Sequence, residues 1–163
     1  MTNSFLRRYR IIVCLSAVCL LGGAFQSVSF ADQEKSLYDR LGGYDAISAV
    51  VDEFLERIWD DPVVGRYFIG MGTDTRNQLR QKNKNLLCFN TGGPCKKINR
   101  PLELTHEGLG ITDKEFDIVA NHIAATLKEF KVPQKEFDEV MTKVGGLRPY
   151  VVDKRIDGPS SKS

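Results

Sequence analysis

Four stretches of the sequence repeat apolar side chains every three to four residues, which is the spacing of one face of an α-helix. In the first stretch, Ile47, Val51 and Phe54 recur at these steps with acidic residues between them. No stretch alternates apolar and polar residues with the period of two that marks a half-buried strand. The sequence therefore predicts an all-α fold with four main helices, over 47–58, 75–91, 112–130 and 134–147.

Prolines and a capping pair mark the limits of these helices. Pro62 and Pro133 should end the helices that precede them, because proline cannot continue a helix. Thr112 and Glu115 have the spacing of a capping box, which predicts a helix start. The connection between residues 93 and 112 carries no clear period. Long connections of this kind inside a compact domain are usually functional, so we expect something to hold this one in place.

The first 31 residues have the three parts of a secretory signal peptide. A cationic start containing Arg7, Arg8 and Arg10 precedes an uncharged apolar stretch over 11–25, and small residues then occupy positions 29 and 31. The apolar stretch is shorter than the about 20 residues that a membrane span needs. We therefore expect 1–31 to be removed on export, with a retained anchor as the alternative. The mature protein should work in a bacterial periplasm without stable membrane association, as one domain over 32–152 followed by a polar, disordered tail over 153–163.

The charge of the remaining chain argues against a nucleic-acid partner. Three of the 23 basic residues and none of the 21 acidic residues lie in the first 31 positions. The body of the protein therefore carries 20 basic and 21 acidic side chains. A nearly neutral body lacks the basic surface that binds a phosphate backbone.

Two cysteines, Cys88 and Cys95, remain after removal of the signal. In an oxidising compartment they could form a disulfide across the short loop between them. The alternative is one buried and one exposed thiol, and spacing alone does not decide between the two.

Few residues are available for catalysis or metal binding. The sequence has no Gly-x-Ser-x-Gly, His-Glu-x-x-His or Cys-x-x-Cys-His motif, and its two histidines and two remaining cysteines lack zinc spacings. We interpret His122 as a structural residue in the middle of a helix. His106 lies in the long connection, next to glycines that allow close approach of a flat or bulky group, and on these residues alone an ordinary loop histidine is the alternative. Haem needs one axial imidazole and an apolar slot, which a protein with so few ligands can supply.

Several motifs along the chain, in this order, resemble group I truncated haemoglobins. They are Ser-Leu-Tyr-Asp-Arg-Leu-Gly-Gly at 36–43, Asp-Pro at 61–62, Tyr-Phe at 67–68, Gly-Gly-Pro at 92–94, Thr-His-x-Gly-Leu-Gly-Ile-Thr at 105–112, Val-Ala-x-His-Ile at 119–123, Val-Pro at 132–133 and Leu-Arg-Pro at 147–149. The resemblance covers about 35–152. It implies a truncated globin fold, a two-over-two helical sandwich around one haem b per chain. It also implies that His106 is the proximal ligand of the iron.

The resemblance further implies the other residues of a haem site. Phe68 should stack on the porphyrin, and the second helix should line the distal side. The full set of cofactor-binding residues is Phe54, Leu55, Phe68, Leu79, Lys82, Asn83, Leu86, His106, Ile111 and Val119. For the apolar members, ordinary core packing is the alternative role.

The sequence departs from the family on the distal side. Leu55 stands where many members have a tyrosine that donates a hydrogen bond to the bound gas, and Leu79 and Asn83 stand where glutamines are frequent. Only Asn83 remains as an evident neutral donor. Since a hydrogen bond to a charged acceptor contributes about 1.5–3 kcal/mol, we expect oxygen to leave fast, with less effect on carbon monoxide.

Lys82 has two alternative roles. In some relatives this position supplies the sixth ligand of the iron. The role we favour for Lys82 is a salt bridge to a haem propionate, because an ammonium must lose its water and its proton before it can bind a metal.

The function predicted from these observations is reversible binding of oxygen, nitric oxide or carbon monoxide, with an unidentified reductant keeping the iron reduced. The alternative is a haem enzyme that detoxifies nitric oxide, as a dioxygenase, or peroxide. Leu55 and Leu79 offer no acid–base group for such chemistry, so we assign no catalytic residue. A sensing or interaction module is a third possibility.

Overall fold

The structure is a computed structural model that describes residues 34–96 and 100–155. The predicted signal, 1–31, lies outside the described residues, as does 156–163 of the predicted tail. None of the helices in the described part is both long and apolar enough to cross a membrane.

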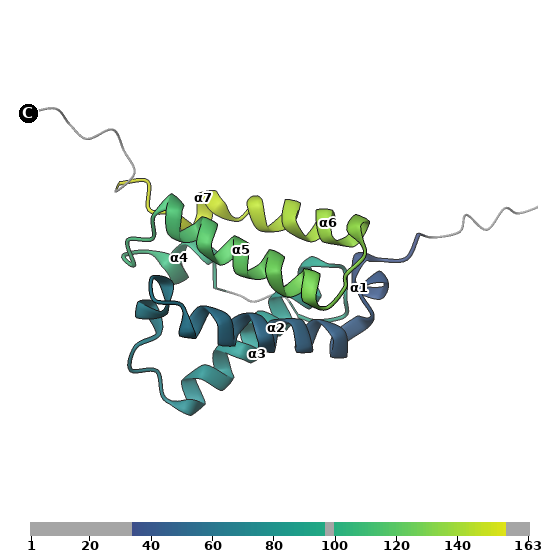
Figure 1. The fold of residues 1–163 in the computed structure, drawn as a ribbon, viewed down its shortest axis with the longest axis horizontal. Coiled ribbons are helices and arrows are strands. Elements are labelled where there is room, and N and C mark those ends of the chain that lie inside the picture. The colour runs from purple at the N-terminus through teal and green to yellow at the C-terminus, as the bar shows by residue number, and fades with distance from the viewer. Residues whose placement is uncertain (1–33, 97–99, 156–163) are drawn as a thin grey trace, which may run out of the picture. The chain divides into compact units, whose positions relative to one another are not determined.

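The described residues form helices and no strand (Figure 1). The elements are α1 (Leu37–Arg40), α2 (Gly43–Asp60), the 3₁₀ helix η1 (Val64–Phe68), α3 (Thr73–Asn90), α4 (Leu102–His106), α5 (Asp113–Glu129), α6 (Gln134–Gly145) and α7 (Arg148–Val151). The predicted all-α class is confirmed. The four predicted helices correspond to α2, α3, α5 and α6, with shifts of a few residues at their ends.

Two pairs of helices make up the body of the domain. In Figure 1, α5 and α6 run in opposite directions as one pair, and α2 and α3 form the other. The two pairs meet where α2 packs against α5. One apolar cluster lies around α2 and takes in the buried residues Ile47, Val51, Leu55, Ile58, Trp59 and Val64. A second cluster lies where α1, α5 and α6 meet, around the buried Leu37, Leu127 and Val140.

The predicted helix limits have clear local causes. α2 ends at Asp60, and Asp61 is extended because the residue before a proline avoids the helical region. The capping box is confirmed, since the Thr112 hydroxyl accepts from the Glu115 amide and the Glu115 carboxylate accepts from the Thr112 amide. Pro133 is the residue just before α6, where its fixed φ fits an extended N-cap.

The long connection contains one short helix, α4, and is joined to α3 by a disulfide. Cys88 and Cys95 are bonded, so the structure decides between the two alternatives for these thiols. Cys88 is fully buried at the end of α3. A Cβ on Gly93 would lie 2.4 Å from the Tyr38 ring and 2.7 Å from the Cys88 sulfur, so only glycine fits at this place in the loop.

The first residues after α7 still belong to the folded domain. The amide of Asp153 donates to the carbonyl of Ile111 at 2.8 Å. The folded domain therefore includes Asp153, the first residue of the predicted tail.

Candidate functional site

The first group of predicted site residues lies in the apolar cluster around α2. Leu55 is 1% exposed and forms part of the cluster itself. Phe54, Phe68, Leu79 and Val119 are partly buried and pack against it. Helices α2, α3 and α5 and the 3₁₀ helix η1 thus bring together five of the ten residues.

A cavity of about 350 Å³ adjoins this group, which is within the usual range for small-molecule sites. Its lining comes from α2, α3, α5, α6 and the turn after α6, and is mostly apolar. Phe54, Asn83 and Leu86 are the predicted site residues that line it. We call the face that α2 and α3 present to this cavity and to the Leu55 cluster the distal wall, made of Phe54, Leu55, Leu79, Asn83 and Leu86.

The distal wall offers very little hydrogen bonding. Leu55 and Leu79 have no polar side-chain atom. The side-chain nitrogen of Asn83 donates to the carbonyl of Leu79 at 2.9 Å, one turn back along α3. One of its two amide hydrogens is therefore already used, and the other is the only side-chain N–H that the distal wall still offers. Elsewhere in the cavity lining, the polar side chains are Asn90 and Lys143.

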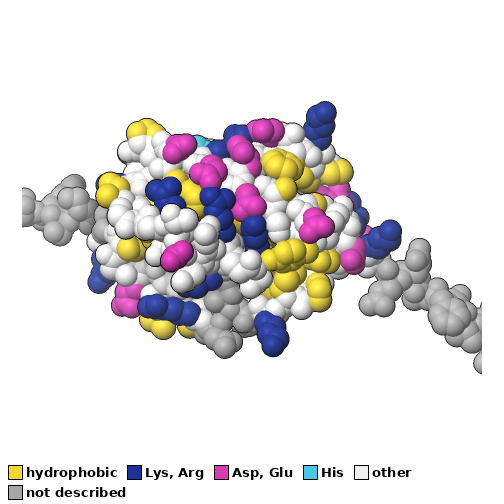
Figure 2. All heavy atoms as spheres, turned by 90° about the horizontal axis from the view of Figure 1, so that it is seen from below, with side chains coloured by type: hydrophobic (Ala, Val, Ile, Leu, Met, Phe, Trp, Pro, Cys, Tyr) yellow, Lys and Arg dark blue, Asp and Glu magenta, His cyan; other side chains and the backbone are white. Residues whose placement is uncertain are grey.

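Lys82 lies next to Asn83 on α3 but is exposed. It makes no ion pair or hydrogen bond within the described residues, whereas Lys84 binds Asp52 and Arg80 binds Asp52 and Glu56. Figure 2 views the domain from the side on which α3 lies, and acidic and basic side chains alternate over this face. Lys82 is thus available for an anionic group that is not part of the protein.

The ring of His106, the last residue of α4, is oriented by the backbone. Its Nδ1 lies 2.8 Å from the Leu102 carbonyl and 3.0 Å from the Thr105 hydroxyl. That hydroxyl itself donates to the Leu102 carbonyl. Because a carbonyl can only accept, Nδ1 carries a proton, and in the neutral imidazole the lone pair is then on Nε2. A histidine held in this way is prepared to bind a metal through Nε2.

The segment after His106 turns sharply and joins α5. Gly108 and Gly110 have φ values of 79° and 63°, in the left-handed region that favours glycine. A Cβ on Gly108 would meet no atom within 4 Å, so the backbone conformation, not crowding, calls for glycine there. Ile111, which follows, is buried.

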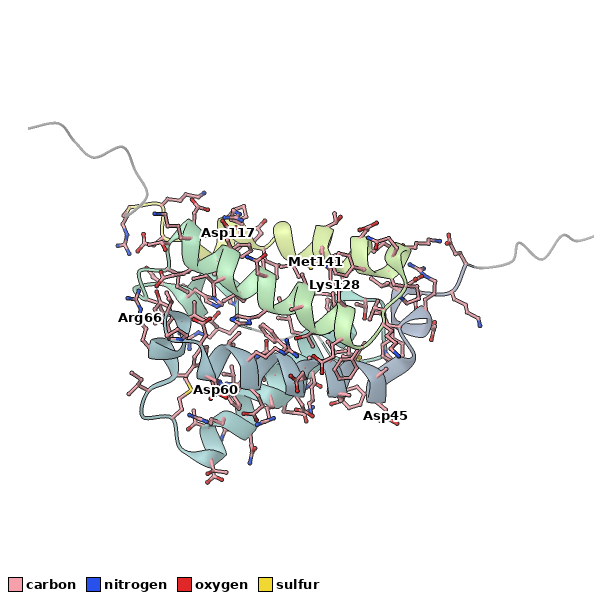
Figure 3. All side chains as sticks on the ribbon, viewed as in Figure 1. Asp45, Asp60, Arg66, Asp117, Lys128 and Met141 are labelled. Carbon is pink, nitrogen blue, oxygen red and sulfur yellow. A yellow bond between two sulfur atoms is a disulfide. The ribbon has the colours of Figure 1, made fainter. Side chains whose placement is uncertain are left out.

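A polar network holds the start of α5 to η1. Glu115 is buried and accepts from Thr112 and from the Tyr67 hydroxyl, both at 2.9 Å, and it pairs with Arg66. Figure 3 shows Arg66 at the edge of the domain where η1 and α4 lie. Burial raises the pKa of Glu115, but the bonds from Thr112 and Tyr67 and the charge of Arg66 outweigh it, and the net pKa is lowered. Burial raises the pKa of Tyr67, so its hydroxyl stays a donor.

These residues fit haem. His106 presents one imidazole nitrogen, and its Nε2 has no hydrogen-bond partner in the described residues. The distal wall supplies a largely apolar surface. Lys82 supplies an exposed cation on α3, the helix that also carries Leu79, Asn83 and Leu86. His106, Ile111 and Lys82 belong to neither the cavity lining nor the Leu55 cluster, so those two features bring together the other seven predicted residues and not these three. No cluster of three or more metal-binding side chains occurs among the described residues, so the porphyrin would provide the remaining ligands.

His122 has a structural role. Its Nε2 lies 2.8 Å from the Asp61 carboxylate, which also accepts from the amides of Val63 and Val64. The hydrogen bond with His122, followed by those from the amides, lowers the pKa of Asp61. His122 therefore fastens α5 to the turn between α2 and η1, in agreement with the structural interpretation.

Sequence reasoning missed several contacts around the site. The motif Tyr-Phe at 67–68 drew attention to Phe68, but the hydroxyl of Tyr67 binds Glu115 across 48 positions of sequence. Arg148 likewise gave no signal beyond the Leu-Arg-Pro motif. The sequence would have indicated these contacts only if the acidic partner stood within a helical turn of Tyr67 or Arg148. The partners, Glu115 and Asp113, lie 48 and 35 positions away.

The helix arrangement and the site define a globin of the two-over-two type. Solved structures agree. The 2/2 hemoglobin of a Synechococcus species, described as carrying covalently attached heme, has a TM-score of 0.65 at 29% identity and covers 75% of this chain and 98% of its own. The truncated hemoglobin of Tetrahymena pyriformis, in a Y25F variant, has a TM-score of 0.67 at 27% identity, covering 74% of this chain and all of its own.

Sequence comparisons specify the family. The family model described as bacterial-like globin matches residues 36–152, and the chain belongs to this family. The group 1 truncated hemoglobin GlbN of Mycolicibacterium paratuberculosis is 32% identical over 71% of this chain and 83% of the relative. The GlbN protein of a Synechocystis strain is 34% identical over 68% of this chain and 90% of the relative.

Proposed function

We propose that this protein holds one haem b through His106 and binds a diatomic gas reversibly. The observation that carries the proposal is the hydrogen bond from His106 Nδ1 to the Leu102 carbonyl. This bond leaves Nε2 as the ring nitrogen that can bind iron. When bound, the haem would supply an iron that takes up oxygen, nitric oxide or carbon monoxide. The protein's own contribution is the imidazole, the apolar wall and the exclusion of water.

The distal wall favours fast release of oxygen. A nearby hydrogen-bond donor stabilises a bound gas that carries partial negative charge, as oxygen does. On the distal wall, the available donor is the remaining N–H of Asn83. Carbon monoxide gathers less charge and should lose less affinity. The same low polarity supports gas binding over the enzymatic alternatives, because peroxide cleavage and nitric oxide oxidation need distal groups that Leu55 and Leu79 do not provide.

Mixing the oxygen-loaded protein with nitric oxide separates binding from catalysis. We expect one equivalent of nitrate per haem and no further turnover when a reductant is added. Sustained nitrate production with a reductant would instead establish a nitric oxide dioxygenase.

Lys82 is proposed to pair with a haem propionate, since it is exposed and lacks a protein partner in the described residues. The ferric absorption spectrum of Lys82→Ala tests this role against iron ligation. An unchanged spectrum supports the salt bridge, and a shift from six- to five-coordinate bands supports ligation.

Export to a bacterial periplasm is part of the proposal. The three-part pattern of residues 1–31 supports it, and the Cys88–Cys95 disulfide suits an oxidising compartment. Expression of the full chain, followed by fractionation and mass analysis, should give a periplasmic product that begins near Asp32 and does not stay with the membranes.

The decisive experiment is His106→Gly. We expect the variant to lose stoichiometric haem uptake and the Soret band of the wild type, and exogenous imidazole to restore part of both. His122→Gly is the matched control and should keep both. A His106→Gly protein with an unaltered Soret band would refute the proposed site.

A further inference from the structure

The short helix that carries His106 is weakly anchored by its own residues. α4 has five residues, and none of them is buried. Leu104, in its centre, is 51% exposed. Nothing in α4 therefore contributes to the hydrophobic core, which normally fixes a helix in place. The hydrogen bond that orients the imidazole is internal to α4, so it fixes the ring relative to α4 and not relative to the rest of the domain.

The C-terminal residues supply the missing anchor. α4 packs chiefly against α7, which is remote in sequence and comes directly before the end of the folded domain. Two residues after α7, the amide of Asp153 donates to the Ile111 carbonyl at 2.8 Å. The segment 102–112 is thus held at its start by α7 and at its end by Asp153. We call residues 148–153 the C-terminal clamp.

The clamp is itself fastened to a long helix. The guanidinium of Arg148 binds the carboxylates of Asp113 and Asp117 on α5, the former at 2.6 Å. It also lies 4.4 Å from the centre of the buried Phe116 ring, in a cation–π contact. In Figure 3, Asp117 lies on the part of α5 beside α7, where this attachment occurs. Because α5 packs against both α2 and α6, Arg148 ties the clamp to the rigid body of the domain.

We infer that the C-terminal clamp positions His106, so that Arg148 and the Asp153 amide set the strength of the bond from the imidazole to iron. This inference rests on the proposed function. Neither residue touches the cofactor in this account; both are positioning residues that act through α4 and Ile111. Removing a group that is hydrogen-bonded directly to a metal ligand typically changes metal affinity by about 10–100-fold. Arg148 and the Asp153 amide act at least one contact further away, so we expect the low end of this range, about tenfold.

Two pairs of variants isolate the clamp. Arg148→Ala removes both ion pairs and the ring contact, and Arg57→Ala is its control. Arg57 also binds two carboxylates, Glu53 on its own helix α2 and Glu129 on α5, and has no hydrogen bond or ion pair with the described residues of 102–112. Asp153→Pro removes the amide donor to Ile111, and Val152, with ψ of 131°, already has the conformation required before a proline. Asp153→Ala keeps that donor and loses only the contacts of the carboxylate with Arg155.

The haem-loaded proteins are compared by haem transfer to excess apomyoglobin and by the iron–histidine stretching band in resonance Raman spectra of the ferrous form. We expect Arg148→Ala and Asp153→Pro to lose haem about tenfold faster than their controls and to shift the band. Far-UV circular dichroism checks that each variant is folded. If both variants match their controls in transfer rate and band position, the inference is wrong, even where the melting temperature falls.

Including His106→Gly in the same assays keeps the inference and the proposed function apart. If His106→Gly binds haem like the wild type, the proposed function fails. If His106 is required but the clamp variants match their controls, only the inference fails.

Discussion

The two sides of the proposed site are built by different physical means. The distal wall consists of side chains on long helices whose apolar faces are buried against one another, with Leu55 almost wholly inside. The segment 102–112 on the other side has a five-residue helix without a buried residue, which packs chiefly against α7, and its Ile111 carbonyl accepts from the distant Asp153 amide. Packing forms the distal wall, whereas a few specific contacts place the imidazole. The two sides should therefore respond differently to mutation.

Truncating one apolar side chain on each side gives the largest contrast. Leu55→Ala should lower the free energy of unfolding by about 3 kcal/mol, because it leaves a cavity in a close-packed core. Leu104→Ala on α4 should change it by no more than about 0.5 kcal/mol, since the residue is half exposed. Urea unfolding of the haem-loaded proteins measures both. Equal losses would contradict the proposed difference between the two sides.

The disulfide joins the distal helix to the connection that leads to His106. Cys95→Ser should destabilise the protein by about 2 kcal/mol, which the chain-entropy model gives for a short closed loop. The measurement is thermal unfolding, with dithiothreitol added to the wild type as a second route to the reduced state. Agreement between the variant and the reduced wild type is expected, and no loss in either would contradict a stabilising bond.

Adding a donor to the distal wall should change ligand kinetics more than stability. Leu55→Tyr should slow oxygen dissociation by about 10–100-fold relative to Leu55→Phe, because a hydrogen bond to a charged acceptor contributes about 1.5–3 kcal/mol. The phenylalanine variant is the control for the added ring. Stopped-flow measurement of oxygen release tests this, and equal rates for the two variants would show that position 55 does not reach the bound gas.

Acid should weaken the contact that holds α5 to the turn after α2. The bond with His122 and the amides of Val64 and Val63 lower the pKa of Asp61, so its carboxylate contributes stability above its unfolded pKa of about 3.9. That contribution is lost as the pH falls through the lower folded value. Asp61→Asn should therefore cost about 1 kcal/mol at neutral pH, and this cost should shrink steadily as the pH falls below about 3.9 and through the lowered folded value.

The neighbouring Asp60→Asn is the control for this effect. Asp60 is exposed and makes no hydrogen bond or ion pair within the described residues. Denaturant unfolding across this pH range should show a difference from the wild type only for Asp61→Asn. A pH-independent cost at position 61 would mean that packing, not charge, is lost.

The sequence by itself determined the all-α class, the four main helices and the capping box, because periodicity, proline and capping are local properties that neighbouring residues decide. Together with its resemblance to a family, it also indicated the candidate site residues. Only the structure decided that Cys88 bonds Cys95, that Asn83 donates one hydrogen to the Leu79 carbonyl, that Arg148 pairs with Asp113 and that the Asp153 amide donates to Ile111. The contacts of Arg148 and Asp153 join residues far apart in the chain, and their geometry exists only after the helices have packed. The disulfide and the Asn83 bond are local in sequence, but they depend on side-chain directions that the sequence pattern does not specify.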